Sequence, residues 1–129
     1  MLSRRGFMGC ALCALAGFEA TGVEAQGLTR TILSRTDGPA AGYETIEARV
    51  DIPAGSAVAR HKHFGIESSY VVAGAIEVDV EGVGPKSYKT GDSWQVPTEA
   101  PHSGKVGAEA ATLIGVYVVE KGKPLATPV

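Results

Sequence analysis

Short strand-like segments alternate with turns along most of this sequence. The chain has 17 glycines and 7 prolines among its 129 residues, and both residue types interrupt regular structure at turns. Several short strands repeating at roughly 8–12 residues are typical of a β-sandwich or β-barrel. The sequence therefore predicts an all-β fold. The strand-like segments are 29–36, 43–52, 56–63, 67–82 with an interruption at Gly74, part of 83–92, 93–97, a segment from His102, and 110–120, followed by a tail over 121–129.

The first 25 residues are expected to be a cleavable export signal. Arg4 and Arg5 precede a mildly apolar stretch, and small residues lead up to Ala25. This order of charged, apolar and small residues is that of a secretory signal. Ser3–Met8 also resembles the twin-arginine export motif. We therefore expect one domain over residues 26–129 and a periplasmic or secreted location; an amphipathic helix of the mature domain is the alternative for this segment.

Composition excludes several classes of function. Cys10 and Cys13 are the only cysteines and lie within the expected export signal, so the mature chain would have neither disulfides nor thiol chemistry. A lipoprotein anchor at Cys10 is disfavoured because little apolar sequence precedes it. The formal charge of −2 supplies no basic patch, so nucleic acid is not an expected partner. No apolar run approaches the roughly 20 residues of a membrane-spanning helix.

The three histidines of the chain are grouped with a glutamate. His61 and His63 are two residues apart, Glu67 follows four residues later, and His102 begins a later strand. Residues i and i+2 of a strand share a face, so His61 and His63 should project together. A straight strand would carry Glu67 about 13 Å beyond His63, so the chain must turn back near Gly65, a residue type that permits a turn. Imidazole together with carboxylate suits divalent transition metals.

The block from Gly55 to Gly74 resembles the first signature of the cupin family. Its fixed positions match in residue type and in spacing, and they are Gly55, His61, His63, Glu67 and Gly74. Gly74, which ends this block, is expected to occupy a turn or bulge where a side chain would strain the backbone.

The block from Gly91 to Val106 resembles the second cupin signature less closely. Gly91, Pro97 and His102 match, whereas Glu99 stands where the family commonly has Gly and Val106 where it commonly has Asn. Because a residue with a Cβ tolerates positive φ poorly, the turn at Glu99 is expected to differ from the usual form. The Glu99 side chain is expected to be solvated rather than to line a pocket.

The cupin resemblance implies a double-stranded β-helix, or jelly-roll barrel, with a metal inside its wider end. It also implies that one divalent transition metal (Fe, Mn, Ni, Cu or Zn) is bound by His61, His63, Glu67 and His102. Four protein ligands would leave one or two coordination positions open. Such an ion can bind a substrate as a Lewis acid, activate water or, if it is redox-active, handle oxygen.

Two classes of function remain open at this point. The first is an exported metal-dependent enzyme, for example an oxygenase acting on a small organic molecule. The second is a non-catalytic barrel that binds a small ligand or a metal. No nucleophile elbow or catalytic triad is evident. The resemblance also implies that a homodimer can form through an edge strand such as residues 29–36.

Neighbouring residues have simpler expected roles. Ser69 has the same strand parity as the glutamate and should face the cavity, leaving space beside the metal. Trp94 is expected in the core rather than as a substrate-stacking ring. Tyr70 is expected to pack in the barrel wall and not to act as a catalytic phenol. Lys62 and Lys105 alternate with the inward residues and should be solvated.

Overall fold

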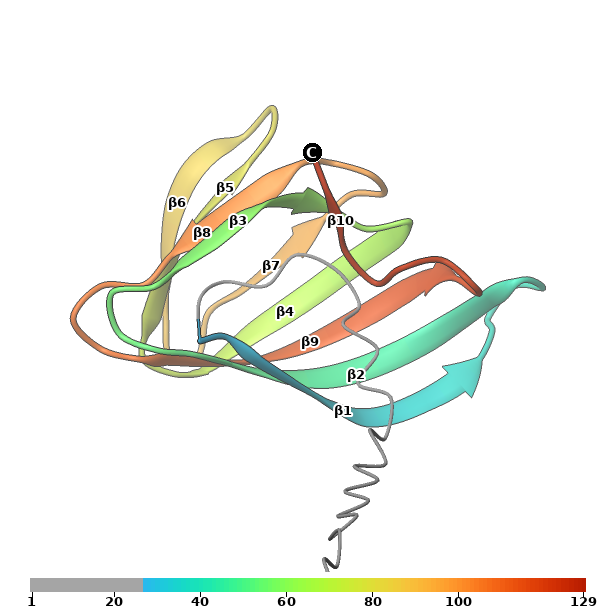
Figure 1. The fold of residues 1–129 in the computed structure, drawn as a ribbon, viewed down its shortest axis with the longest axis horizontal. Helices are drawn as coiled ribbons and strands as arrows, with labels where there is room; N and C mark the ends of the chain where they lie inside the picture. Colours follow the sequence, from blue (N-terminus) through green and yellow to red (C-terminus); the bar gives the residue numbers. More distant parts are fainter. Residues whose placement is uncertain (1–26) are drawn as a thin grey trace, which may run out of the picture.

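Residues 27–129 are described by a computed structural model in which ten β-strands form two facing antiparallel sheets (Figure 1). One sheet has the strand order β1-β2-β9-β4-β7 and the other β10-β3-β8-β5-β6. The strands are β1 (Thr29–Asp37), β2 (Tyr43–Ile52), β3 (Ala57–Lys62), β4 (Gly65–Ala73), β5 (Ala75–Val80), β6 (Gly84–Lys89), β7 (Ser93–Val96), β8 (His102–Lys105), β9 (Ala111–Glu120) and β10 (Thr127–Pro128).

The chain passes repeatedly from one sheet to the other. After the β1–β2 hairpin, β3 lies in the second sheet, β4 in the first, the β5–β6 hairpin in the second, β7 in the first, β8 in the second and β9 in the first. This alternation is that of a double-stranded β-helix. The predicted all-β jelly-roll fold is therefore confirmed. No helix in the described residues is long and apolar enough to span a membrane, and the predicted export signal over residues 1–25 lies outside them.

Most predicted strands agree with the observed ones. The segment 43–52 coincides with β2, and 29–36 lies within β1. The long segment 67–82 divides at Gly74, as predicted, into β4 and β5. Gly74 has a φ of +81°, and an added Cβ would lie 2.1 Å from the carbonyl oxygen of Ala110. Both observations explain why only glycine fits at this break.

The interior is built largely by strands in which buried residues alternate with more exposed ones, most regularly in β9. In β9, which pairs with β2 on one side and β4 on the other, every second residue is buried. Leu113 of this strand points inwards among buried valines and isoleucines of both sheets, and Tyr117 packs with Ile46, Val119 and Leu125. Each such side chain stabilises the fold by about 1.5–3 kcal/mol relative to exposure. This apolar packing holds the two sheets together around the site described below.

Two details of the fold differ from the sequence-based expectations. Val71 of β4 is fully buried, but its neighbours Tyr70 and Val72 are 49% and 44% exposed on the outer face of the sheet, so Tyr70 does not pack in the barrel interior. The expected tail is partly structural, because Leu125 and Ala126 are buried and β10 pairs with the end of β3.

Candidate metal centre

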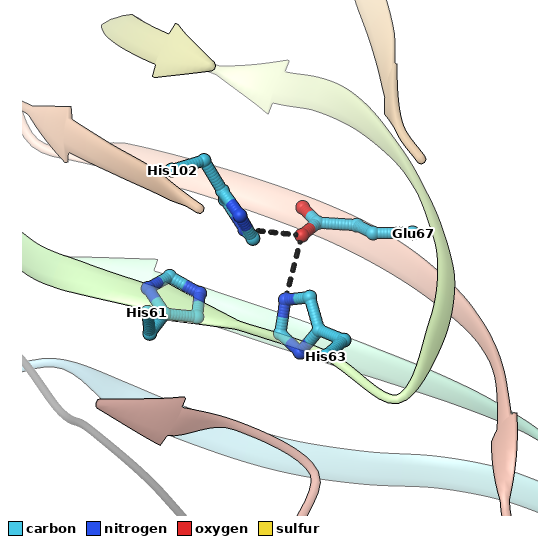
Figure 2. A group of neighbouring side chains, drawn as sticks. All are labelled: His61, His63, Glu67 and His102. Carbon is cyan, nitrogen blue, oxygen red and sulfur yellow. Dashed lines mark hydrogen bonds and ion pairs between the residues drawn. The ribbon is translucent and has the colours of Figure 1, made fainter. Parts of the chain in front are cut away.

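The structure brings together the four residues that the sequence analysis grouped. His61 lies in β3, His63 directly after it, Glu67 in β4 and His102 at the start of β8. Their side chains converge in the barrel interior (Figure 2). One candidate ligand atom from each lies within 4.8 Å of all the others, and all four residues are buried. The cluster therefore draws on both sheets.

The turn that returns Glu67 towards the histidines is present, but its glycine serves a different purpose from the one predicted. Gly65 does not have a positive φ. It starts β4 opposite Val119 of β9, and an added Cβ would lie 1.8 Å from the carbonyl oxygen of Val118. Glycine is needed here because two backbones approach closely, and not because the turn requires an unusual backbone conformation.

Each imidazole is oriented by a backbone carbonyl on its outer side. A carbonyl oxygen can only accept a hydrogen bond, so each Nδ1 carries its proton and each Nε2 is turned towards the centre of the cluster. The pairs are His61 Nδ1 with Ala59 O at 2.8 Å, His63 Nδ1 with Leu125 O at 2.5 Å and His102 Nδ1 with Ala100 O at 3.0 Å. The three rings are thus preset to present three nitrogens to one point.

Glu67 lies at that point. Its Oε2 is 2.9 Å from Nε2 of both His63 and His102, and its Oε1 accepts a 2.7 Å hydrogen bond from the Ser69 hydroxyl. Burial alone would raise the pKa of Glu67, but the hydrogen bonds with His102 and His63 and the charge these rings carry when protonated outweigh burial and hold it well below its usual range. Burial and the charge of His102 lower the pKa of His61 to about 4, so His61 is neutral at neutral pH.

These contacts fit a bound cation. A carboxylate oxygen and an unprotonated ring nitrogen both carry lone pairs, so a 2.9 Å approach needs a proton or a metal ion between them. Two ligand atoms that each lie about 2.1 Å from one metal ion, with an angle of about 90° between them at the ion, are about 3.0 Å apart. The two observed separations of 2.9 Å between Glu67 Oε2 and the ring nitrogens are close to this value. The four side chains could therefore hold one metal ion, with nitrogen and carboxylate ligands suited to a transition metal.

Comparison with known proteins identifies the family. Residues 48–120 match the family model described as the cupin domain, a span that covers more than half of the chain and contains the whole cluster. The chain belongs to the cupin family. No curated protein matches the sequence significantly.

Solved structures share the cupin fold at low sequence identity. KdgF from a Halomonas species has 22% identity and a TM-score of 0.63, with 76% of this chain and 89% of that chain covered. The cupin domain of Cnp3 from Schizosaccharomyces pombe has 25% identity and a TM-score of 0.62, covering 76% and 65%. The DMSP lyase DddQ from Ruegeria pomeroyi has 23% identity and a TM-score of 0.64, covering 74% and 48%. These similarities establish the barrel.

The turn before His102 corrects one expectation. Glu99 has a φ of 60°, so the backbone adopts the left-handed conformation even though glycine is replaced, and the prediction of a different turn was wrong. The Glu99 amide donates to the carbonyl of His63 at 3.0 Å, and its half-exposed carboxylate pairs with Lys62 at 3.0 Å. These two contacts to the neighbouring segment offset the strain of the left-handed residue, which costs about 1–2 kcal/mol.

Ser69 faces the interior as predicted, and its hydrogen bond to Glu67 gives it a positioning role that strand parity alone did not suggest. The Leu125 carbonyl that orients His63 was missed. It is 62 residues away along the chain, and a backbone acceptor leaves no trace in residue type. The cupin site is therefore completed by the C-terminal segment, outside the residues that match the family model.

A cavity of about 40 Å³ lies beside the cluster in the cupin interior. Trp94 is 8% exposed and belongs to the core, as expected, and it also lines this cavity. A core position is therefore compatible with contact between this ring and a molecule in the cavity. Arg30 and Tyr117 line the same cavity and were not anticipated. Burial raises the pKa of Tyr117 well above its usual range, the charge of Glu67 adds to this effect, and Arg30 opposes it. The Tyr117 phenol is therefore neutral at neutral pH.

Proposed function

We propose that this cupin binds one divalent transition metal through His61, His63, Glu67 and His102 and acts on a small organic molecule in the adjacent cavity. The observation that carries the proposal is the orientation of the cluster. All three imidazoles have their Nδ1 bound to a carbonyl, which leaves three Nε2 atoms and a carboxylate directed at one point. Fe, Mn, Ni, Cu and Zn all suit such a donor set.

The charges of the cluster favour chemistry at the ion. Three neutral imidazoles and one carboxylate reduce the charge of a divalent ion to about +1. When bound, such an ion supplies Lewis-acid or, if it is redox-active, oxygen chemistry at its open positions. Ser69 holds Glu67 in place, and the wall of the adjacent cavity is mainly apolar.

An oxygenase is the reaction class we favour. Outside the cluster, the ionisable side chains that line the cavity among the described residues are Arg30 and Tyr117. Arginine keeps its proton in proteins. The raised pKa of Tyr117 keeps its phenol protonated at neutral pH, so the phenol has no free site to accept a proton from a substrate. No described cavity group is thus suited to general-base catalysis near neutral pH, which disfavours hydrolysis and epimerisation.

A non-catalytic barrel that binds a small ligand or a metal is the alternative. Its support is the diversity of the fold, because a barrel of this kind occurs both in a DMSP lyase and in Cnp3 of Schizosaccharomyces pombe. Fold therefore does not decide the reaction.

Elemental analysis of protein purified without added metal or a histidine tag tests the metal proposal, with stoichiometric transition metal expected. Oxygen uptake with phenolic, thiol and diketone compounds then separates the two functions. Turnover supports the oxygenase, whereas saturable binding without oxygen uptake supports the non-catalytic barrel.

We also infer that residues 1–25 direct export to the periplasm or beyond. The arginine pair and the small residues before Ala25 support this proposal. Replacement of Arg4 and Arg5 by lysine should leave precursor in the cytoplasm. Normal export of the double variant would reject the twin-arginine route.

A homodimer through β1 is a further proposal. This strand lies at an edge of its sheet, where unpaired backbone groups can accept a second strand, and its Ile32 and Leu33 are 44% and 50% exposed. Analytical ultracentrifugation of the wild type and of Leu33→Lys tests it. A dimer that persists unchanged in the variant would count against pairing through β1.

A further inference from the structure

Two side chains of the cavity wall carry buried N–H groups without a partner among the described residues. They are Nε and Nη1 of Arg30 and Nε1 of Trp94, and both residues line the cavity beside the metal cluster. Buried polar groups are nearly always hydrogen-bonded, and a buried charge without a counter-charge is especially unfavourable. Arginine cannot relieve this by losing its proton. The cavity therefore has donors in excess.

The position of Arg30 in the interior is fixed by strand register. Arg30 of β1 lies opposite Val50 of β2, which is 4% exposed in the core, and paired residues project to the same face of a sheet. The Arg30 guanidinium is close enough to Tyr117 to lower the pKa of its phenol, and both residues line the same cavity. The Tyr117 ring in turn lies 5.0 Å from the His63 ring, which connects Arg30 to the cluster.

The space for this arrangement depends on a glycine. Gly115 lies two residues before Tyr117 on the same face of β9, and an added Cβ would be 2.8 Å from the Tyr117 hydroxyl. Glycine at 115 thus allows the phenol to lie across the strand, where Arg30 meets it. The guanidinium is held by the barrel and does not depend on a flexible loop.

Within residues 27–129, no carboxylate of the cavity wall neutralises Arg30. Glu67 is the only acidic side chain among the described residues that line the cavity, and its oxygens are engaged by His63, His102 and Ser69. The free N–H groups, together with a metal at the cluster, would make the cavity attractive to an anion. The remaining wall is mainly apolar, with side chains such as Ile76 and Leu113.

We propose that Arg30 and Trp94 form a subsite for the carboxylate group of a small organic acid, with the apolar part of the acid packed against the aliphatic wall. A guanidinium matches a carboxylate in charge and in hydrogen-bond geometry, and the indole N–H adds a neutral donor. A single water needs about 10–15 Å³ of cavity, so the volume of about 40 Å³ indicates a ligand of few non-hydrogen atoms. This inference deepens the proposed function by naming its substrate class, but the subsite itself does not require the metal.

Trp94 provides the assay because it is the only tryptophan in the chain. Purified wild-type protein, in a zinc-loaded form and in a metal-free form, is titrated with propionate while Trp94 fluorescence is recorded. Propionamide, which has nearly the same shape without the charge, and sodium chloride at matched ionic strength are the reference titrations. We expect saturable change with propionate and at least about tenfold weaker response to propionamide, since a hydrogen bond to a charged group contributes about 1.5–3 kcal/mol.

The decisive variant is Arg30→Gln, which should weaken propionate binding about tenfold or more on the same reasoning. Arg49→Gln is the matched control, because Arg49 has a half-exposed side chain in the strand next to β1 and loses the same charge; its propionate affinity should change less than twofold. Arg30→Lys retains the charge and should bind with intermediate affinity. Circular dichroism and metal content of every variant establish that the barrel and the cluster are intact.

The outcomes separate this proposal from the proposed function. Propionate binding that depends on Arg30 in the metal-free protein supports the subsite even if the wild type were found to bind no metal. Normal metal content with no propionate response in the wild type overturns the subsite and leaves the metal proposal standing. Equal binding of propionate by wild type and a folded Arg30→Gln, or of propionamide and propionate by wild type, also overturns it.

Discussion

Replacement of Gly65 by alanine tests the account of how the chain returns Glu67 to the histidines. An added Cβ would lie 1.8 Å from the carbonyl oxygen of Val118 and 2.7 Å from Cα of Val119. Both are backbone atoms of β9, so no change of side-chain rotamer can relieve the clash. The start of β4 must therefore move away from β9 by more than 1 Å to reach an ordinary contact distance.

The cost can be worked from the contacts that this movement would disturb. Forced overpacking in a close-packed region costs about 1–3 kcal/mol. The shift would also weaken the 3.0 Å hydrogen bond from the Glu120 amide to the Phe64 carbonyl, worth about 1 kcal/mol. We expect the free energy of unfolding to fall by about 2–4 kcal/mol, equivalent to a decrease in Tm of roughly 10–20 °C for a domain of this size. Metal content should fall as well, because His63 and Glu67 flank the displaced residue.

Gly107→Ala is the matched control. It makes the same change at a glycine that has no positive φ and no neighbouring atom within 4 Å of the added Cβ, so it should alter stability by less than about 0.5 kcal/mol. Urea unfolding and thermal melts of the two variants and the wild type, followed by circular dichroism, give the comparison. Equal stability of Gly65→Ala and Gly107→Ala would refute the close-approach argument.

Three further predictions address the site. His61→Ala and His102→Ala should each lose most bound metal while remaining folded. Glu67→Gln should lose less metal because its amide oxygen can still coordinate. Wild-type metal content in both histidine variants, measured by mass spectrometry, would refute the ligand assignment. Metal-free protein should lose stability in acid, because the lowered pKa values of His61 (about 4) and Glu67 mean that the unfolded chain binds more protons. The His61 contribution is complete above about pH 6.5 and is lost as the pH falls towards about 4, and the Glu67 contribution is lost at lower pH still; unfolding midpoints that do not change between neutral pH and pH 4 would contradict this. Glu99→Gly should relieve the left-handed strain and raise the free energy of unfolding by up to about 1 kcal/mol. Loss of the surface pair with Lys62 should reduce this gain slightly. A clear loss of stability in urea would show that the carboxylate matters more than the strain.

Local sequence patterns were sufficient for much of the fold and for the grouping of the cluster. Period-two alternation and turn residues predict strands such as β2, and the i, i+2 relation places His61 and His63 on one side. These predictions succeed because they depend on backbone geometry within a few residues. The break at Gly74 was predicted on the same basis and is confirmed by its φ of +81°.

Contacts between distant segments were not predictable in this way. Whether Gly65 is needed for its φ or for space depends on where β9 passes, 54 residues later at Val119. The inward position of Arg30 depends on its register with Val50, and a lone arginine in a strand-like segment is more commonly solvated. At Glu99 local propensity gave the wrong answer, because the backbone bond to His63 and the pair with Lys62 hold the residue at positive φ in spite of the strain.

The assembly of the cluster from both sheets has a consequence for the whole barrel. His61 and His102 are paired across β3 and β8 of one sheet, Glu67 comes from the other sheet, and His63 is oriented by Leu125 of the C-terminal segment. A ligand that binds the folded chain and not the unfolded chain stabilises folding by an amount that grows with the logarithm of its affinity. A metal bound by these four side chains would therefore join the two sheets and the C-terminal segment at one point, so metal affinity and barrel stability should rise and fall together. The cavity with Arg30 and Trp94 lies between the same sheets and is lined by His61, Glu67 and His102 as well, which places the proposed carboxylate subsite directly beside the metal cluster.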